Sequence, residues 1–216
     1  MLDLFDIAKP QGCDIQTFYG SGITSGINRS WSKPRGISNI YMLLIGAGGS
    51  GDGTTGGGSG AVTVWYGSAQ NVPDNLIITV GNAGTSSTVS YRTTQSTTYS
   101  LLSGNSALNT IGGTAMTANQ FAASGFFQSI AGQSGSSAGI TASGTTFLSG
   151  GGSAASSFTA NYGYTLPTSV SASGFFYLQP IIVSLGGKGN GKGSLGSGGG
   201  AASGPGGQGM VLIASW

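Results

Sequence analysis

Residues 40–60 decide the fold of this chain, and they read IYMLLIGAGGSGDGTTGGGSG. The run over 40–45 is apolar at every position, which excludes a strand with one face in water and predicts a strand buried on both faces. The glycine track at 46–60 has too few side chains to pack as a helix or an ordinary strand, and fixing its backbone costs much conformational entropy. It is therefore either a flexible loop or a place where bare backbones stack.

A second glycine track precedes another apolar run. Residues 186–209 are glycine at about half their positions, and the run MVLI at 210–213 follows. If this run and residues 40–45 are neighbours in one sheet, the two tracks lie side by side. Extended helices with three residues per turn can then hydrogen-bond to one another, and the glycine spacing is too irregular for collagen. The glycines expected in this packing are Gly46, Gly48, Gly49, Gly51, Gly198, Gly199, Gly200, Gly206 and Gly207.

These features predict an all-β fold, with a β-sandwich-like base that carries polyglycine II-type segments and little helix. Further strands are expected at 17–19, 29–31, 61–66 and 76–80, with one or two more between 86 and 102, because these stretches are rich in β-branched and aromatic residues. A strand broken by Pro180 is expected within 174–185. Residues 103–172 are rich in Ala, Ser, Thr and Gly, and their elements cannot be assigned from the sequence.

Length and composition favour one ordered domain. The chain has 216 residues, of which 43 are glycine, only 6% are charged and 38% are hydrophobic. Disordered chains usually combine high charge with few apolar residues, which is the opposite pattern. We expect an N-terminal docking arm over residues 1–30 and a glycine-rich β domain over 31–216, with a Ser/Thr/Ala-rich insertion at about 91–185. Cys13 is the only cysteine; we expect it to be a buried apolar residue, with an intermolecular thiol as the alternative.

The charge pattern limits the partners. A net charge of +2 is too small to predict a nucleic-acid-binding surface, and no apolar run is long enough to insert into a membrane. No charged residue occurs from 93 to 187, so the surface there relies on hydroxyls and amides, which suits a protein in an assembly or outside the cell. We expect a homo-oligomer, a trimer, because copies can cover each other's sheet edges.

The residues needed for common enzyme chemistry are missing. The chain has no His and no Glu, and its five acidic residues are scattered aspartates. A serine triad lacks its base, and a zinc site lacks its ligands. The glycine motif after residue 45 mimics a dinucleotide fingerprint, but no helix can follow it. We therefore expect no enzymatic activity, no cofactor and no metal site.

The ordered set of motifs resembles the glycine-rich domain of bacteriophage tail fibres, adhesins and related virion structural proteins. The matching features are Trp31, the Pro34–Gly36 turn, the strand and glycine track at 37–60, the VGNAG motif at 80–84, and the Gly-Pro-Gly at 204–206 before the last apolar run. The resemblance covers roughly residues 31–90 and 186–216. Residues 91–185 depart from the family pattern.

The resemblance implies a viral structural protein exposed on the virion surface as a spike or short fibre that mediates host attachment. Its partners would be copies of itself, other virion proteins through residues 1–30, and a host surface receptor, with glycan as a candidate. The receptor-binding candidates are Phe126, Phe127, Tyr162 and Tyr164, because aromatic rings stack on sugars or pack on apolar patches; burial in the core is their alternative fate. Two other roles stay open: a shell-forming capsid protein without a receptor role, and a non-viral glycine-rich structural protein.

Overall fold

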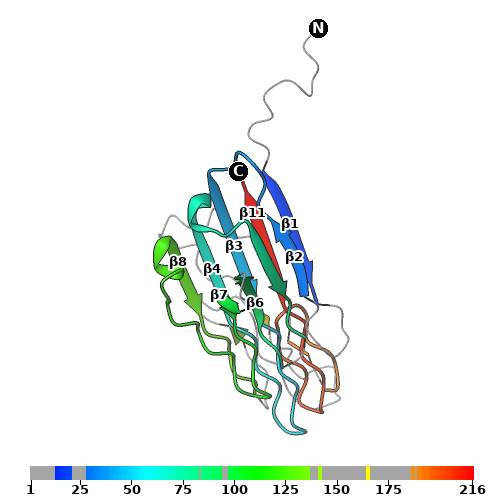
Figure 1. Ribbon diagram of the computed structural model, residues 1–216. Coiled ribbons are helices and arrows are strands. Elements are labelled where there is room, and N and C mark those ends of the chain that lie inside the picture. Colours follow the sequence, from blue (N-terminus) through cyan, green and yellow to red (C-terminus); the bar gives the residue numbers. More distant parts are fainter. Residues whose placement is uncertain are drawn as a thin grey trace.

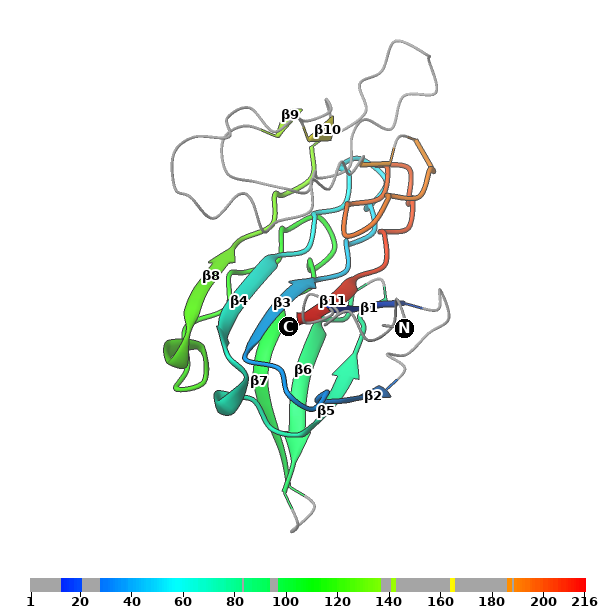
Figure 2. The ribbon, with the colours of Figure 1, turned by 90° about the horizontal axis from the view of Figure 1, so that it is seen from above.

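The described part of the chain forms a β-sandwich with a layer of glycine-rich backbone at one end (Figure 1). A computed structural model describes residues 13–20, 28–82, 84–93, 97–136, 186–187 and 189–216, together with the backbone of 141–142 and 164–165. Most described strands belong to two antiparallel sheets that pack face to face (Figure 2). The expected all-β, sandwich-like fold is therefore confirmed.

The first sheet has the strand order β1-β11-β3-β4-β8. Its strands are β1 (Asp14–Tyr19), β11 (Met210–Ser215), β3 (Asn39–Ile45), β4 (Val62–Ser68) and β8 (Phe126–Ile130). The second sheet has the order β2-β5-β6-β7, formed by β2 (Asn28–Ser32), β5 (Asn75–Thr79), β6 (Ser87–Arg92) and β7 (Thr98–Gly104). Two-residue strands β9 (Thr141–Ala142) and β10 (Tyr164–Thr165) pair in parallel.

Helical structure in the described residues is limited to two short 3₁₀ turns, η1 (Ala69–Asn71) and η2 (Ala122–Ser124). The expectation of little helix holds for this part of the chain. No helix among the described residues has the length and apolar character needed to cross a membrane.

Strand β3 is buried on both faces, as its unbroken apolar sequence predicts. Ile40, Met42 and Leu44 point into the core between the two sheets, which also contains Trp31 and Trp65. The alternate residues Tyr41, Leu43 and Ile45 belong to a second apolar cluster, on the outer face of the same sheet. Burial raises the pKa of Tyr41 well above its ordinary value, in keeping with a dry outer face at that point.

The predicted pairing of the two apolar runs is also confirmed. Strand β11 lies antiparallel to β3, with Met210 opposite Ile45 and Ser215 opposite Ile40. This register brings the end of β3 and the start of β11 to the same end of the sandwich. The glycine tracks that continue from these strand ends therefore begin as neighbours.

The two tracks hydrogen-bond to each other along their length. The amide of Gly48 donates to Gly207 at 2.9 Å, and the amide of Gly51, three residues further on, donates to Gly204 at 3.0 Å. Gly199 in turn donates to the carbonyl of Gly49 at 3.0 Å. The glycine tracks are thus packed ribbons that satisfy each other's backbone groups, and they are not free loops.

The hydrogen bonds of residues 56–61 repeat with a period of three. Residues three apart donate to the same neighbouring segment, and successive residues donate to different ones. Gly57 and Gly60 donate to Gly199 and Gly196, Gly58 and Ala61 to Asn109 and Asn105, and Gly56 and Ser59 to Ser136 and Gln133, all at 2.7 to 3.0 Å. A helix with three residues per turn presents its amides in this way. The central ribbon therefore has the hydrogen-bonding pattern of a polyglycine II-type helix.

Two of the ribbons come from a region that the sequence left unassigned. Residues 105–113 and 132–136 join 46–61 and 189–209 in what we call the glycine layer. Gly113 donates to Ser59, Gly132 to Gly113 and Gly135 to Thr110, at 2.7 to 2.8 Å. Segments rich in Ser, Asn and Ala can thus extend the layer, provided that glycine stands where two backbones touch.

The sandwich has two different ends. Ile45, Val62, Gly104 and Met210 lie at strand ends next to the glycine layer. Asp14 pairs with Ser215 at the other end, which we call the opposite end (Figure 1). Strand β1 is thus part of the first sheet, and Cys13 beside it is exposed. The expectation of a buried Cys13 is wrong because β1 is an edge strand whose first residues face solvent.

Space in the glycine layer gives a stability test. A methyl group on Gly57 would overlap the carbonyl of Gly49, whereas one on Gly53 would meet nothing within 4 Å. Gly53 has a φ of +105°, so alanine there is strained in the backbone alone. We expect Gly57→Ala to lower the free energy of unfolding by about 3 kcal/mol or more, because neither backbone can move aside. Gly53→Ala should cost about 1 kcal/mol. Chemical denaturation of both variants measures this, and equal losses would contradict tight packing of the layer.

Candidate functional site

A groove of about 470 Å³ opens between the two sheets at the opposite end, on the side where β7 and β8 are the edge strands. Its walls come from the turn after η1, from β6 and β7, and from the loop that contains η2. We call it the tyrosine groove; it is lined by Asn71, Pro73, Tyr91, Tyr99, Ser100, Leu101, Asn119, Gln120, Phe121 and Ser124. The volume lies within the range of about 300–1,000 Å³ that is typical of small-ligand sites.

The β6–β7 hairpin supplies a pair of aromatic rings to this groove. Tyr91 and Tyr99 are directly opposite each other in the strand register, and their rings stack with centroids 5.4 Å apart and planes 21° apart. Tyr91 is half-buried and packs against the core, while Tyr99 is 48% exposed. The inner ring thus supports the outer one, and the outer ring is available to a ligand.

The facing wall carries a second aromatic contact. Phe121 stacks on the fully buried Trp65, with ring centroids 4.8 Å apart. Trp65 belongs to β4, which lies between β3 and β8 in the first sheet, so Phe121 packs on a ring that is itself held in the core. Rings on both walls are thereby fixed by contacts with the sandwich core.

Two asparagines hold the loop that carries Phe121. Asn119 donates from Nδ2 to the carbonyl of Leu101 at 2.9 Å and accepts from the amide of Ala122 at 2.8 Å. Asn71 donates to the carbonyl of Ser124 at 3.0 Å. These bonds connect η1, η2 and β7 around the groove. The groove is therefore built by side chains from segments far apart in the sequence.

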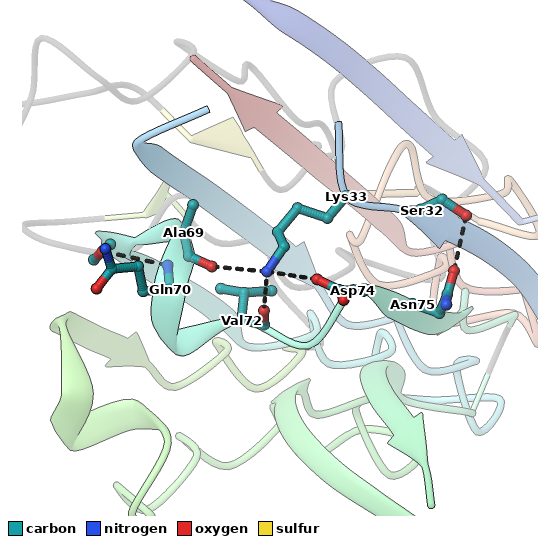
Figure 3. Close-up of polar contacts among 8 residues, drawn as sticks. Ser32, Lys33, Ala69, Gln70, Val72, Asp74 and Asn75 are labelled. Carbon is teal, nitrogen blue, oxygen red and sulfur yellow. Dashed lines mark hydrogen bonds and ion pairs between the residues drawn. The ribbon is translucent and has the colours of Figure 1, made fainter. Parts of the chain in front are cut away.

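A second groove, of about 460 Å³, lies on the other side of the η1 segment and contains Lys33 (Figure 3). The ammonium of Lys33 donates to the carbonyls of Ala69 and Val72 at 3.2 and 2.8 Å and pairs with Asp74 at 2.8 Å. Beside it, Ser32 donates to the side chain of Asn75 at 2.9 Å. All three donors of the lysine are occupied by the protein. Lys33 therefore fastens η1 and the turn after it to the end of β2, and we assign it a structural role.

Only two of the four predicted receptor-binding residues, Phe126 and Phe127, have side chains within the described structure. Phe126 and Phe127 are both half-buried in edge strand β8, opposite Tyr66 and Trp65 of β4, and Phe127 packs against the core between the sheets. Tyr164 is in β10, with its side chain outside the described residues, and Tyr162 lies outside them altogether. For Phe127, the alternative of core packing is what the structure shows.

Sequence reasoning missed the aromatic residues of the tyrosine groove. Tyr91 and Tyr99 stand in a Ser/Thr-rich stretch where only the hairpin register makes them neighbours. Phe121 stands in a segment with no readable periodicity. One signal in the sequence could have found the pair. Tyr91 and Tyr99 are at equal distances before and after the connection between β6 and β7, and residues placed in this way are directly opposite each other in a hairpin.

The described residues contain no group of three or more His, Cys, Asp or Glu side chains able to hold a metal ion. The sequence matches no protein-family model, and no curated protein shows significant similarity to it.

The role of Lys33 can be tested with a matched control from its own loop. Lys33→Met keeps the aliphatic stem but leaves the carbonyls of Ala69 and Val72 without their charged donor. We expect it to lower the free energy of unfolding by about 2 kcal/mol, since bonds to charged groups are worth about 1.5–3 kcal/mol and the exposed Asp74 adds little. Arg35→Met changes an exposed cation nearby and should shift stability by less than about 0.5 kcal/mol. Denaturation that does not distinguish the two variants would contradict this role.

Proposed function

We propose that this chain is a bacteriophage structural protein exposed on the virion as a spike or short fibre that mediates attachment to the host surface. The observation that carries the proposal is the packed glycine layer. It is the physical feature that the resemblance to the glycine-rich domain of tail fibres and adhesins implies. A layer of this kind gives an outer end that is built mainly from hydrogen-bonded backbone.

The two ends of the sandwich suit a protein that is held at one end and presents the other. Residues 14 and 215 pair at the opposite end, where the docking arm proposed within residues 1–30 would meet other virion proteins. The Ser/Thr/Ala-rich segment leaves the glycine layer after Ser136, which accepts from Gly56, and returns to it at Gly187, which donates to Gly198. This segment is thus attached at the end that would face outward.

Self-association is part of the proposal. Strand β1 is at the edge of the first sheet, and Ile15 and Tyr19 on it are 60% and 50% exposed. They lie on the same face as the buried Met210 and Ala214 of β11, so they extend the apolar outer cluster to the sheet edge. An apolar edge strand is a surface that copies of the same chain can cover, and we propose a trimer.

The proposal predicts a position on the particle and a competition effect. Antibody labelling and electron microscopy should find the protein as projections at vertices or tail, in groups of three copies. Purified protein at micromolar concentration should reduce adsorption of the phage to its host, because it occupies the same receptors.

Many copies tiling the particle, with no competition, would replace this proposal by a shell-forming role. Absence from any particle would favour a non-viral structural protein. The single variants Phe126→Ser and Leu108→Ser, made in the competing protein, decide which end meets the receptor. Loss of competition with Phe126→Ser alone would place the contact at the opposite end, whereas loss with Leu108→Ser, which changes a 70%-exposed apolar residue of the glycine layer, would place it at the outward end.

A further inference from the structure

We infer that the tyrosine groove binds a neutral saccharide. The inference goes beyond the proposed attachment role and does not rest on it, because the groove lies at the opposite end, where that role places the contact with other virion proteins. The physical argument uses only the groove itself, which lies at the side of the opposite end, away from the glycine layer.

The first part of the argument is the aromatic surface. Tyr99 is half exposed and backed by the stacked ring of Tyr91, and Phe121 on the facing wall is backed by Trp65. An aromatic face carries partial negative charge, so it attracts the weakly positive C–H groups on the flat face of a sugar ring. Because each ring is already held in place, little side-chain entropy is lost when a ligand stacks on it.

The second part is the set of polar groups that line the same groove. Gln120, Asn71 and Ser100 are exposed, and each combines a hydrogen-bond donor with an acceptor. A sugar hydroxyl likewise donates and accepts, so amides and hydroxyls can pair with it in either direction. Asn119 is committed to the protein through both ends of its amide and serves to position the loop.

The third part is the charge of the groove. None of the described residues that line it is Lys, Arg, Asp or Glu. A phosphate or carboxylate ligand would find no cation there, and binding an anion without one carries a desolvation penalty. A purely apolar ligand would cover the amide of Gln120 and the hydroxyl of Ser100 without offering them a hydrogen bond. A neutral ligand that has both apolar faces and hydroxyl groups meets both requirements: it carries no charge, and it can hydrogen-bond to the polar groups of the groove.

Saturation-transfer NMR on the full chain tests the inference with four probes. Chitotetraose, maltotetraose and mannotetraose are neutral, and sialyllactose is their acidic counterpart. At least one neutral probe should receive saturation on its ring C–H protons with a dissociation constant of about 1 mM or tighter. Failure of all three neutral probes, or preferential binding of sialyllactose, would overturn the inference.

Matched variants locate the site. Tyr99→Ala should weaken the binding by at least about tenfold, because truncation of a central aromatic residue removes the stacking surface. Tyr99→Phe keeps the ring and should retain most of the affinity. Leu108→Ala is the control, since Leu108 is 70% exposed but lies in the glycine layer, outside the groove.

Two results in these experiments would reject the site. One is equal weakening of sugar binding by Tyr99→Ala and Leu108→Ala, while Tyr99→Phe binds normally. The other is the absence of binding by any of the neutral sugars, together with tight binding of a proline-rich decapeptide. That result would make the groove a peptide site of the kind that recognises extended proline helices. Sugar binding is measured on the isolated protein, so its failure is distinct from a failure to find the protein on a particle.

Discussion

The structure depends on one interaction, the peptide hydrogen bond between glycine ribbons. Each such bond contributes only about 1 kcal/mol net, whereas fixing a residue's backbone costs about 1–2 kcal/mol, and glycine costs the most. The layer therefore does not hold itself together. Its ribbons are held in register by the strands that enter and leave it, above all β3 and β11, which are buried in the sandwich. The apolar core and the bare backbone are thus two parts of one folding unit.

The same constraint explains the unusual composition. Where two ribbons touch, a side chain would collide with a carbonyl, as a methyl group on Gly49 would with that of Asn109. Where a ribbon faces away, small polar residues are accepted. Asp52 stabilises a bend within the first track by accepting bonds from the amides of Thr54 and Thr55, which hold the pKa of its carboxyl below the usual value. Binding surfaces must then come from elsewhere. In the described structure the aromatic groove lies at the opposite end, where ordinary side chains form the walls.

The parts of this fold that could be predicted are those in which composition alone restricts the backbone. The apolar run at 40–45 cannot have one face in water, and the glycine tracks cannot be α-helices. The strands β3 and β11 and the contact between their glycine tracks could therefore be predicted. Strand β8 and the ribbons at 105–113 and 132–136 could not be predicted, because Ser, Ala and Asn fit a loop, a strand or a ribbon equally well. The groove depends on register and packing: Tyr91 meets Tyr99 only through the hairpin, and Phe121 meets Trp65 only through the sandwich.

Amide hydrogen exchange measured residue by residue with NMR tests the central claim most directly. The amides of Gly49 and Gly51 donate to Gly58 and Gly204, whereas that of Ser50 between them makes no hydrogen bond with a described residue. We therefore predict slow exchange at residues 56–61, Gly49 and Gly51, together with fast exchange at Ser50. Exchange at free-peptide rates throughout 46–60 would contradict the account, because the ribbons would then be loops without partners.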